Sequence, residues 1–320
     1  MTWVGLALPA VASPPGHLVR VGILEPFAPS FDPVSNPSHR AFVKGLHELG
    51  YELGRDVVIE YRSALGGGSA ELVKAASELL ASKIDVLVAA GPRPILAAAQ
   101  ATTTVPIVMV RGADVVETGL VASLARPGRN LTGLAVNAAE IAAKRVQLLK
   151  EAVLGLSRVA VLWNATLQSM MLDFQNIKQA SPTLGVTVQS VRVGRSDEFD
   201  KAFAAIADGQ PQGLVVLFGP LRGDDLSRIV EFTVSHRLPT IFQLGQGVRG
   251  GGLMEFGASN EQMFHRAAAF VDKIANGADP ASIPVEEPTS FELVINLKAA
   301  KALGLAIPQT LLGRADKVIE

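Results

Sequence analysis

The sequence predicts an α/β fold made of two doubly wound parallel-sheet lobes that are joined by a multi-strand hinge. Three observations predict it. Apolar, β-branched runs alternate with helical patterns along the chain, and many of these runs are apolar at consecutive positions. Such runs are typical of strands buried on both faces of a parallel sheet. The same order of elements then occurs a second time, and 320 residues are enough for two domains.

The first half of the chain alternates strand-like and helical segments. The expected strands are Val19–Phe27, Val57–Tyr61, Asp85–Ala90 and Pro106–Val110, and the expected helices are Ser38–Leu49, Glu71–Ser82 and Ile95–Thr102. In the first of these helices Phe42, Leu46 and Leu49 recur at helical spacing. This alternation is the pattern of a doubly wound parallel sheet covered by helices.

The second half repeats the scheme. VRVGILEP at 19–26 matches RVAVLWN at 158–164, DVLVAAGP at 85–92 matches GLVVLFGP at 213–220, and VPIVMVRG at 105–112 matches LPTIFQLG at 238–245. The helix end at Leu49-Gly50 matches Leu184-Gly185, where each glycine is suited to the left-handed position after a helix. Four matches in one order predict two homologous lobes.

The chain is expected to cross between the lobes near 130–137, near 253–257 and within 284–297. The helix Asn260–Asn276 carries apolar residues at helical spacing and is expected to pack back on the first lobe. The first lobe is therefore assigned 19–136 plus 256–283, and the second 137–255 plus 284–320. Several crossings make a hinge, and a hinge makes a cleft that can close on a ligand.

The ligand site of an open α/β sheet lies beyond the carboxyl ends of its strands. This rule selects the residues that follow the predicted strands, together with two positions that would line the hinge. The candidate ligand-binding residues are Glu25, Pro26, Phe27, Gly91, Pro92, Arg93, Arg111, Asp114, Asn137, Trp163, Asn164, Phe218, Gly219, Gln243 and Phe256.

Several of these candidates have a second interpretation. Arg111 ends an apolar strand and could hold a carboxylate in a bidentate pair, or it could form a salt bridge with Asp114 or Glu117. The segment 91–94 could present a helix N-terminus to an anion, or it could be a tight turn whose two prolines remove donors. Trp163 and Phe218 could stack on a ligand or belong to the core.

The composition argues against most catalytic and nucleic-acid functions. The chain has no cysteine, which excludes thiolate catalysis, cysteine-ligated metals and disulfides. Its five histidines are scattered without a metal-binding spacing, and neither a phosphate-binding loop nor a Gly-x-Ser-x-Gly elbow occurs. A net charge of −1 gives no reason to expect nucleic acid as a partner. We therefore expect no catalytic residue, metal or cofactor.

The N-terminal segment is the only targeting signal. Val4–Ala12 is a short apolar stretch that ends in Ala-Val-Ala, and a Ser-Pro-Pro-Gly break follows. This resembles the late part of a signal peptide, although no basic residue precedes it. Residues 1–18 are expected to be the remnant of a truncated signal or a disordered apolar tail.

Several longer phrases in the sequence resemble one family. They are GRDVVIEYR, TTTVPIVMV, TGLVASLARPGRNLTGLAV, KRVQLLKEAVLGLSRVAVLWN, RAAAFVDKIANGADPASIPVEEPTSFELVINLKAAKALGL and IPQTLLGRADKVIE. Over nearly all of 19–320 the chain resembles the ABC transporter substrate-binding proteins of the tryptophan-binding-like group. The resemblance implies a type I periplasmic-binding fold, export to the periplasm and delivery of the ligand to an ABC permease. We expect a monomer that binds a small molecule such as an amino acid or a related organic acid.

The chain departs from this family near the expected cleft. The family commonly has Asp-Pro where Asp114-Val115 stands, an apolar residue at the position of Arg111, and a Thr or Ser near 91–94. These departures leave the ligand open. Two other functions remain as alternatives: a cytoplasmic ligand-sensing module, for which 1–18 is too short to hold a DNA-binding domain, and an enzyme built on the same lobes.

Overall fold

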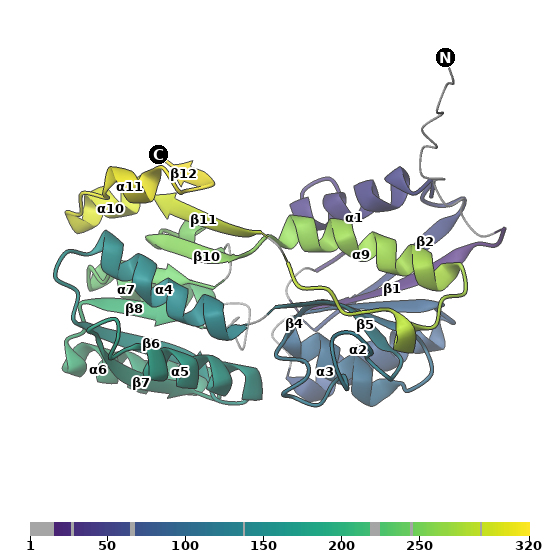
Figure 1. Cartoon of the computed structure of the whole chain (residues 1–320), viewed down its shortest axis with the longest axis horizontal. Helices are drawn as coiled ribbons and strands as arrows, with labels where there is room; N and C mark the ends of the chain where they lie inside the picture. Colours follow the sequence, from purple (N-terminus) through teal and green to yellow (C-terminus); the bar gives the residue numbers. More distant parts are fainter. Residues whose placement is uncertain are drawn as a thin grey trace, which may run out of the picture.

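The chain folds into two α/β lobes that lie side by side (Figure 1). The computed structural model describes residues 16–26, 29–64, 68–136, 138–217, 225–243, 246–288 and 290–320. In each lobe a central sheet is covered by helices, and the described part of the chain begins on one lobe at Gly16 and ends on the other at Glu320.

The first lobe contains a five-stranded parallel sheet in the order β2-β1-β3-β4-β5. Its strands are β1 (Val19–Glu25), β2 (Val57–Ser63), β3 (Val86–Ala90), β4 (Ile107–Ala113) and β5 (Leu131–Val136). Its helices are α1 (Pro37–Glu48), α2 (Ser69–Ala81), α3 (Pro92–Ala101) and, from much later in the chain, α9 (Asn260–Ala275).

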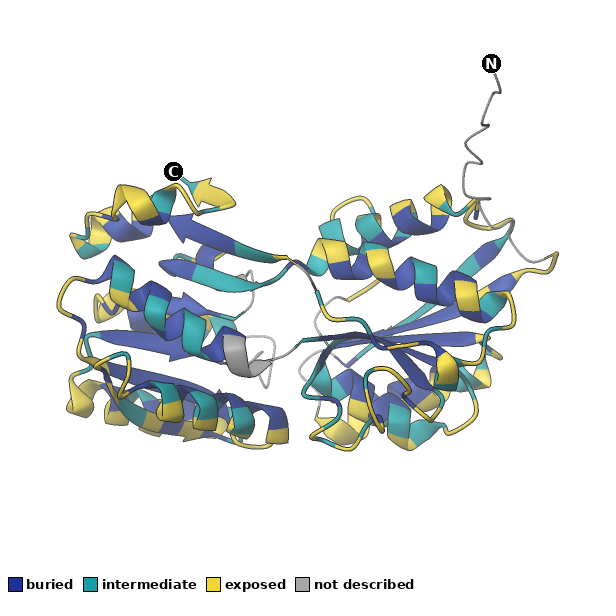
Figure 2. Ribbon diagram, viewed as in Figure 1, coloured by how far each residue is buried: buried dark blue, intermediate teal, exposed yellow. Residues whose placement is uncertain are grey.

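Both faces of this sheet are buried, as the consecutive apolar runs predict. Val86, Val88 and Ala90 of β3 pack with α1 and α9, whereas Leu87 and Ala89 pack on the opposite face with α2 and α3. All five residues of β3 are fully buried. Figure 2 shows the sheets of both lobes as buried layers beneath helices whose outer faces are exposed.

The second lobe contains a seven-stranded sheet in the order β12-β11-β10-β9-β8-β6-β7. Its strands are β6 (Arg158–Asn164), β7 (Thr187–Val193), β8 (Gly213–Val216), β9 (Thr240–Phe242), β10 (Met254–Ala258), β11 (Phe291–Asn296) and β12 (Lys317–Ile319). Its helices are α4 (Ala138–Ala152), α5 (Gln168–Ala180), α6 (Phe199–Gly209), α7 (Asp225–Ser235), α8 (Gln246–Arg249), α10 (Leu297–Leu303) and α11 (Gln309–Leu312). The chain also contains two short 3-10 helices, η1 (Ser196–Glu198) and η2 (Pro280–Ser282).

The strand order confirms the internal repeat. The order β2-β1-β3-β4-β5 of the first sheet recurs as β7-β6-β8-β9-β10 in the second, with β11 and β12 added beyond β10. The matched glycines Gly50 and Gly185 both have left-handed backbone, with φ of 89° and 61°. The sequence therefore predicted correctly both the fold class and the correspondence between the lobes.

The chain passes between the lobes after β5, after β10 and shortly before β11 (Figure 1). All of β10 pairs within the second sheet, so the second passage follows Ala258. Val285 is still buried in the first lobe, and Glu286 forms a bridge with Leu134 of β5. The assigned boundaries at 256 and 284 are therefore wrong by a few residues, because residues 256–258 belong to the second sheet and Val285 and Glu286 stay with the first lobe. The third passage, between Glu286 and Phe291, lies within the expected range 284–297.

The described residues contain neither a long apolar helix nor a cluster of metal-binding side chains. No helix in this part of the chain is long and apolar enough to span a membrane. In the same ranges no group of three or more His, Cys, Asp or Glu side chains is placed to hold a metal ion.

Candidate functional site

A cavity of about 900 Å³ lies between the two lobes and is lined by residues of both. In the first lobe its wall consists of the carboxyl ends of β1, β3 and β4 and the first turns of α1, α3 and α9. In the second lobe it consists of α4, the start of α5, β10, β11 and β12. This size is within the range of small-molecule pockets.

The structure brings part of the predicted site together around this cavity. The predicted residues that line it are Glu25, Pro26, Gly91, Pro92, Arg93, Arg111 and Gln243. Phe27, Asn137, Phe218 and Gly219 lie outside the described residues.

Arg111 lies at an irregular step of β4. Met109 pairs with Gly133, but Gly112 pairs with Ala135, so β4 holds one more residue than β5 between these pairs. Arg111 adopts a left-handed backbone with φ of 63°. A β-bulge re-aims a side chain, and a non-glycine residue in this region costs of order 1–3 kcal/mol. The strained backbone is therefore found at Arg111, whose side chain forms part of the cavity wall.

The Arg111 guanidinium has no protein partner among the described residues. Its Nε atom is buried without a hydrogen bond, and no ion pair joins the side chain to Asp114 or Glu117. Burial lowers the pKa of Arg111, and the charge of Glu25 opposes that shift. The salt-bridge interpretation is wrong for this structure, and the arginine retains donors for another group.

Gly91 lies directly beside this arginine. A Cβ atom at Gly91 would be 3.5 Å from Nη2 of Arg111, and the glycine itself has φ of 99°. Pro92 occupies the first position of α3, which starts here, and the N–H of Gly91 donates to the carbonyl of Val110. The segment 91–94 is thus a tight strand-to-helix turn that also forms cavity wall, and the positive φ of Gly91 is the reason that a glycine suits this turn.

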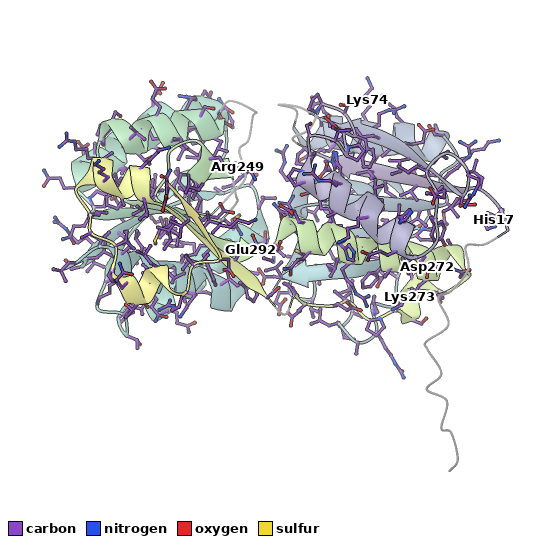
Figure 3. The ribbon with its side chains drawn as sticks, turned by 90° about the horizontal axis from the view of Figure 1, so that it is seen from above. His17, Lys74, Arg249, Asp272, Lys273 and Glu292 are labelled. Carbon is purple, nitrogen blue, oxygen red and sulfur yellow. The ribbon has the colours of Figure 1, made fainter. Side chains whose placement is uncertain are left out.

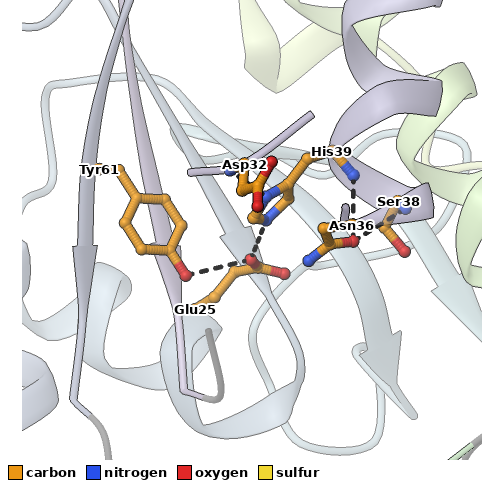
Figure 4. A network of polar contacts seen from close by, with 6 residues as sticks. All are labelled: Glu25, Asp32, Asn36, Ser38, His39 and Tyr61. Carbon is orange, nitrogen blue, oxygen red and sulfur yellow. Dashed lines mark hydrogen bonds and ion pairs between the residues drawn. The ribbon is translucent and has the colours of Figure 1, made fainter. Parts of the chain in front are cut away.

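Glu25 is held by a polar network at the end of β1 (Figure 4). Its Oε2 atom lies 2.6 Å from Nε2 of His39 and accepts a hydrogen bond of 3.3 Å from the hydroxyl of Tyr61. The backbone N–H of Asp32 donates to Nδ1 of His39 at 2.9 Å. Since Nδ1 accepts, the imidazole proton is on Nε2 and is donated to Glu25.

This network leaves one oxygen of Glu25 for the cavity. His39 is fully buried and Glu25 is 8% exposed. Among the described residues Oε1 of Glu25 has no hydrogen-bond partner, and the residue is part of the cavity wall. Burial and the nearby Glu25 charge raise the pKa of Tyr61, so its hydroxyl remains a donor. The arrangement orients a carboxylate toward the cleft.

Four predicted residues do not line the cavity. Trp163 stacks on Phe174 at 5.3 Å and donates from Nε1 to the hydroxyl of Ser190. Asn164 is fully buried and accepts from the backbone N–H and the hydroxyl of Thr166. These two side chains are structural because they stabilise the end of β6.

The other two are Phe256 and Asp114. The Phe256 ring packs beside Phe291 at 5.9 Å, while its flanking residues on β10 face the cavity. The alternation of side chains along a strand explains this, since neighbours point to opposite faces. The backbone carbonyl of Asp114 accepts from the N–H and the hydroxyl of Thr118, which places Asp114 at the start of a turn.

The wall formed by the second lobe is charged, and the strand-end rule does not predict it. It includes Arg145 of α4, Arg249, Glu255 of β10, Glu292 of β11 and Lys317 of β12. Figure 3 shows Arg249 and Glu292 on this lobe near the interlobe space, whereas Asp272 and Lys273 of α9 lie on the far side of the first lobe. Lys317 and Glu292 form an ion pair of 3.5 Å.

Burial and the neighbouring charge of Glu292 raise the pKa of Glu255 to about 7. Arg249, Lys317 and Arg145 oppose this shift. Glu255 therefore changes charge near neutral pH, within the cavity wall. The cavity as a whole presents fixed charges of both signs, which is the arrangement of a recognition site for a small polar molecule.

One signal could have revealed Arg145. It stands four residues after Ile141 and four before Leu149, and both of these are buried. Residues at this spacing share one face of a helix. A charged side chain within an apolar helical stripe is either paired or functional, and the sequence alone does not distinguish the two.

Two α/β lobes with one strand order, three connecting segments and a cavity between them define a two-lobed ligand-binding protein. The profile of the ABC transporter substrate binding protein family matches residues 32–319. The chain belongs to this family.

Relatives and solved structures agree with this assignment. A tyrosine-binding protein of Clostridioides difficile (strain R20291) is 24% identical over 277 residues, which cover 85% of this chain and 78% of the relative. A conserved domain protein from Vibrio cholerae superposes with a TM-score of 0.84 at 25% identity, covering 94% of this chain and 99% of that one.

A domain from Streptococcus pneumonia in complex with L-Trp superposes with a TM-score of 0.85 at 23% identity, covering 95% of this chain and 100% of that one. The fold is therefore that of type I periplasmic binding proteins.

Proposed function

We propose that this protein captures a small carboxylate-bearing molecule, an amino acid or a related organic acid, in the interlobe cavity and delivers it to an ABC permease. The observation that carries the proposal is the Arg111 guanidinium. It lines the cavity, and within the described ranges it has neither a hydrogen bond nor an ion pair. Leaving such a group unpaired is costly, and a carboxylate is the partner that matches its fork of donors.

Glu25 adds a recognition element of opposite charge on the same wall. The residue lines the cavity, its Oε1 atom has no hydrogen-bond partner among the described residues, and its charge acts on Arg111. An ammonium group is a natural donor to a carboxylate oxygen that has no other partner. A ligand with a carboxylate for Arg111 and an ammonium for Glu25 is an amino acid.

The relatives support the same ligand class. One is a tyrosine-binding protein and another was solved with L-Trp. In the described part of this cavity Phe264 is the only aromatic side chain, because Trp163 and Phe256 pack elsewhere. We therefore propose that the feature recognised in common is the charged carboxylate and ammonium of an amino acid. Trp163 and Phe256 do not stack on the ligand in this proposal.

Export and a non-catalytic role complete the proposal. The apolar stretch that ends at Ala12 supports export to the periplasm, where an importer collects its substrate. Cell fractionation tests this directly, since a cytoplasmic pool would instead favour a ligand-sensing module. Mass spectrometry of the bound compound tests the absence of catalysis, because an enzyme would return an altered molecule.

A thermal-shift screen of amino acids and organic acids tests the ligand class. A ligand at 100 times its Kd adds about 2.7 kcal/mol of stability, which shifts a melting curve clearly. We expect carboxylates to raise the Tm, and their methyl esters, in which the carboxylate charge is removed, to have no effect. Stabilisation by neutral sugars instead would contradict the proposal.

A further inference from the structure

A second arginine, which is itself buried, faces the same cavity from the opposite lobe. Arg145 of α4 is 2% exposed, and its Nε atom donates to the carbonyl oxygen of Phe256 at 2.8 Å. Nη1 is buried with no hydrogen-bond partner, and Nη2 would lie 3.7 Å from a Cβ atom at Gly257. In the described part of the chain Nη2 has no hydrogen-bond partner either.

The bond to Phe256 orients this guanidinium. Because Nε is committed to β10, the two Nη atoms form the edge that remains available, and that edge fits a carboxylate in a bidentate pair. Arg145 and Gly257 both line the cavity. The fold thus fixes a fork of donors in the wall, and the described residues supply no acceptor for it.

The carboxylates near Arg145 do not neutralise it directly. The charges of Asp173 and Glu255 favour the positive form of Arg145, but neither carboxylate forms an ion pair with it within 4.0 Å. Burial lowers the pKa of Arg145 to about 10, so the side chain remains positive at neutral pH. Burial also raises the pKa values of Asp173 and Glu255 to about 7, so both are partly protonated there.

We infer that Arg145 forms a second anion subsite, so that the ligand carries two anionic groups, one bound by Arg111 in the first lobe and one by Arg145 in the second. This inference rests on the proposed function and specifies its substrate class as acidic amino acids or related dicarboxylates. Such a ligand connects the two lobes through its two ends, and closure of the cleft then pairs both arginines.

Matched ligand pairs test the inference on the full chain. L-glutamate and L-glutamine have nearly the same shape and differ in one charge, as do L-aspartate and L-asparagine. We expect calorimetry to show that at least one acid binds about tenfold or more tightly than its amide. Amides that bind as tightly as the acids would overturn the second subsite.

Substitution of Arg145 separates this inference from the proposed function. Arg145→Met should reduce the acid-to-amide preference to within about threefold, and Arg145→Lys should keep part of it because the charge remains. The lysine variant and the native ligand pairs still decide the matter if the methionine variant fails to fold. If Arg145→Met weakens the binding of acid and amide equally, the acid-to-amide affinity ratio stays unchanged. That result would mean that one carboxylate contacts both arginines, and it would overturn the inference. The absence of binding by any carboxylate would contradict the proposed function itself.

Discussion

The Nε2 atom of His39 and the Oε2 atom of Glu25 lie 2.6 Å apart at the end of the first strand. The same imidazole accepts from the backbone N–H of Asp32 through Nδ1, so both ring nitrogens are committed. The buried histidine therefore acts as an orienting group. It fixes one oxygen of Glu25, and the other oxygen remains available to the cavity.

Replacing His39 should destabilise the fold. His39→Leu removes the donor to Glu25 and leaves the Asp32 N–H without its acceptor in a partly buried site. Each such group costs about 1–3 kcal/mol, so we expect the free energy of unfolding to fall by about 2–4 kcal/mol in urea titrations. His47→Leu on the same helix is the control, since His47 is exposed and its pair with Glu52 is weak. Equal effects of the two substitutions would contradict a structural role for the network.

Asp173 should make stability depend on pH. Burial raises its pKa to about 7 from an ordinary value of 3.8, while Arg145 opposes the shift, and neither carboxylate oxygen has a hydrogen bond. The folded state therefore holds a proton that the unfolded state releases, and the stability that this proton contributes is lost as the pH rises from about 4 through about 7.

Asp173→Asn should accordingly be more stable than the native protein at about pH 8 and similar to it at about pH 5, by urea denaturation. Asp208→Asn, at an exposed position of α6, should show no such pH-dependent difference. An asparagine variant that is less stable at high pH would show that the charge of Asp173 is stabilising.

Glu255 should make ligand affinity depend on pH. Its pKa is raised to about 7, and it lines the cavity in which we place an anion. A bound anion raises that pKa further, so binding takes up protons and affinity should increase severalfold as the pH falls from about 8 to about 6. Glu255→Gln should flatten this dependence in calorimetry. Unaltered pH dependence in this variant would assign the effect to another group.

The hinge should open and close about its connecting segments. They are the passages that follow Val136 and Ala258 and the passage between Glu286 and Phe291. We expect a carboxylate ligand to reduce the radius of gyration in small-angle scattering, because a closed cleft pairs groups from both lobes. Arg111→Met with the same ligand serves as the control and should show a smaller change. One radius with and without saturating ligand would exclude closure.

The sequence was sufficient to predict the two lobes, because buried parallel strands are apolar at consecutive positions and because the repeat doubles the signal. It also placed Glu25 and Arg111 at the cavity, since strand ends meet at one edge of a sheet. Trp163 and Asn164 follow the same rule and yet pack into the second lobe. The end of a strand brings the backbone close to the cavity, but the direction of each side chain depends on its packing partners. Phe174 is such a partner, because Trp163 stacks on it.

The charged wall of the second lobe could not be predicted from strand ends either. Arg145, Glu255 and Lys317 come from segments far apart in the sequence, and only the folded sheet brings β10, β11 and β12 beside α4. The tautomer of His39 likewise depends on a loop that returns Asp32 to the helix. No local pattern carries that information.

The affinity of Arg111→Met for a carboxylate ligand found by thermal shift tests the central claim most directly. Arg129→Met, at an exposed position of the same lobe, is the matched control. We predict that Arg111→Met weakens binding about tenfold or more by calorimetry without lowering the Tm, while Arg129→Met binds like the native protein. Native affinity in Arg111→Met together with a lowered Tm would contradict the account and make Arg111 a structural residue.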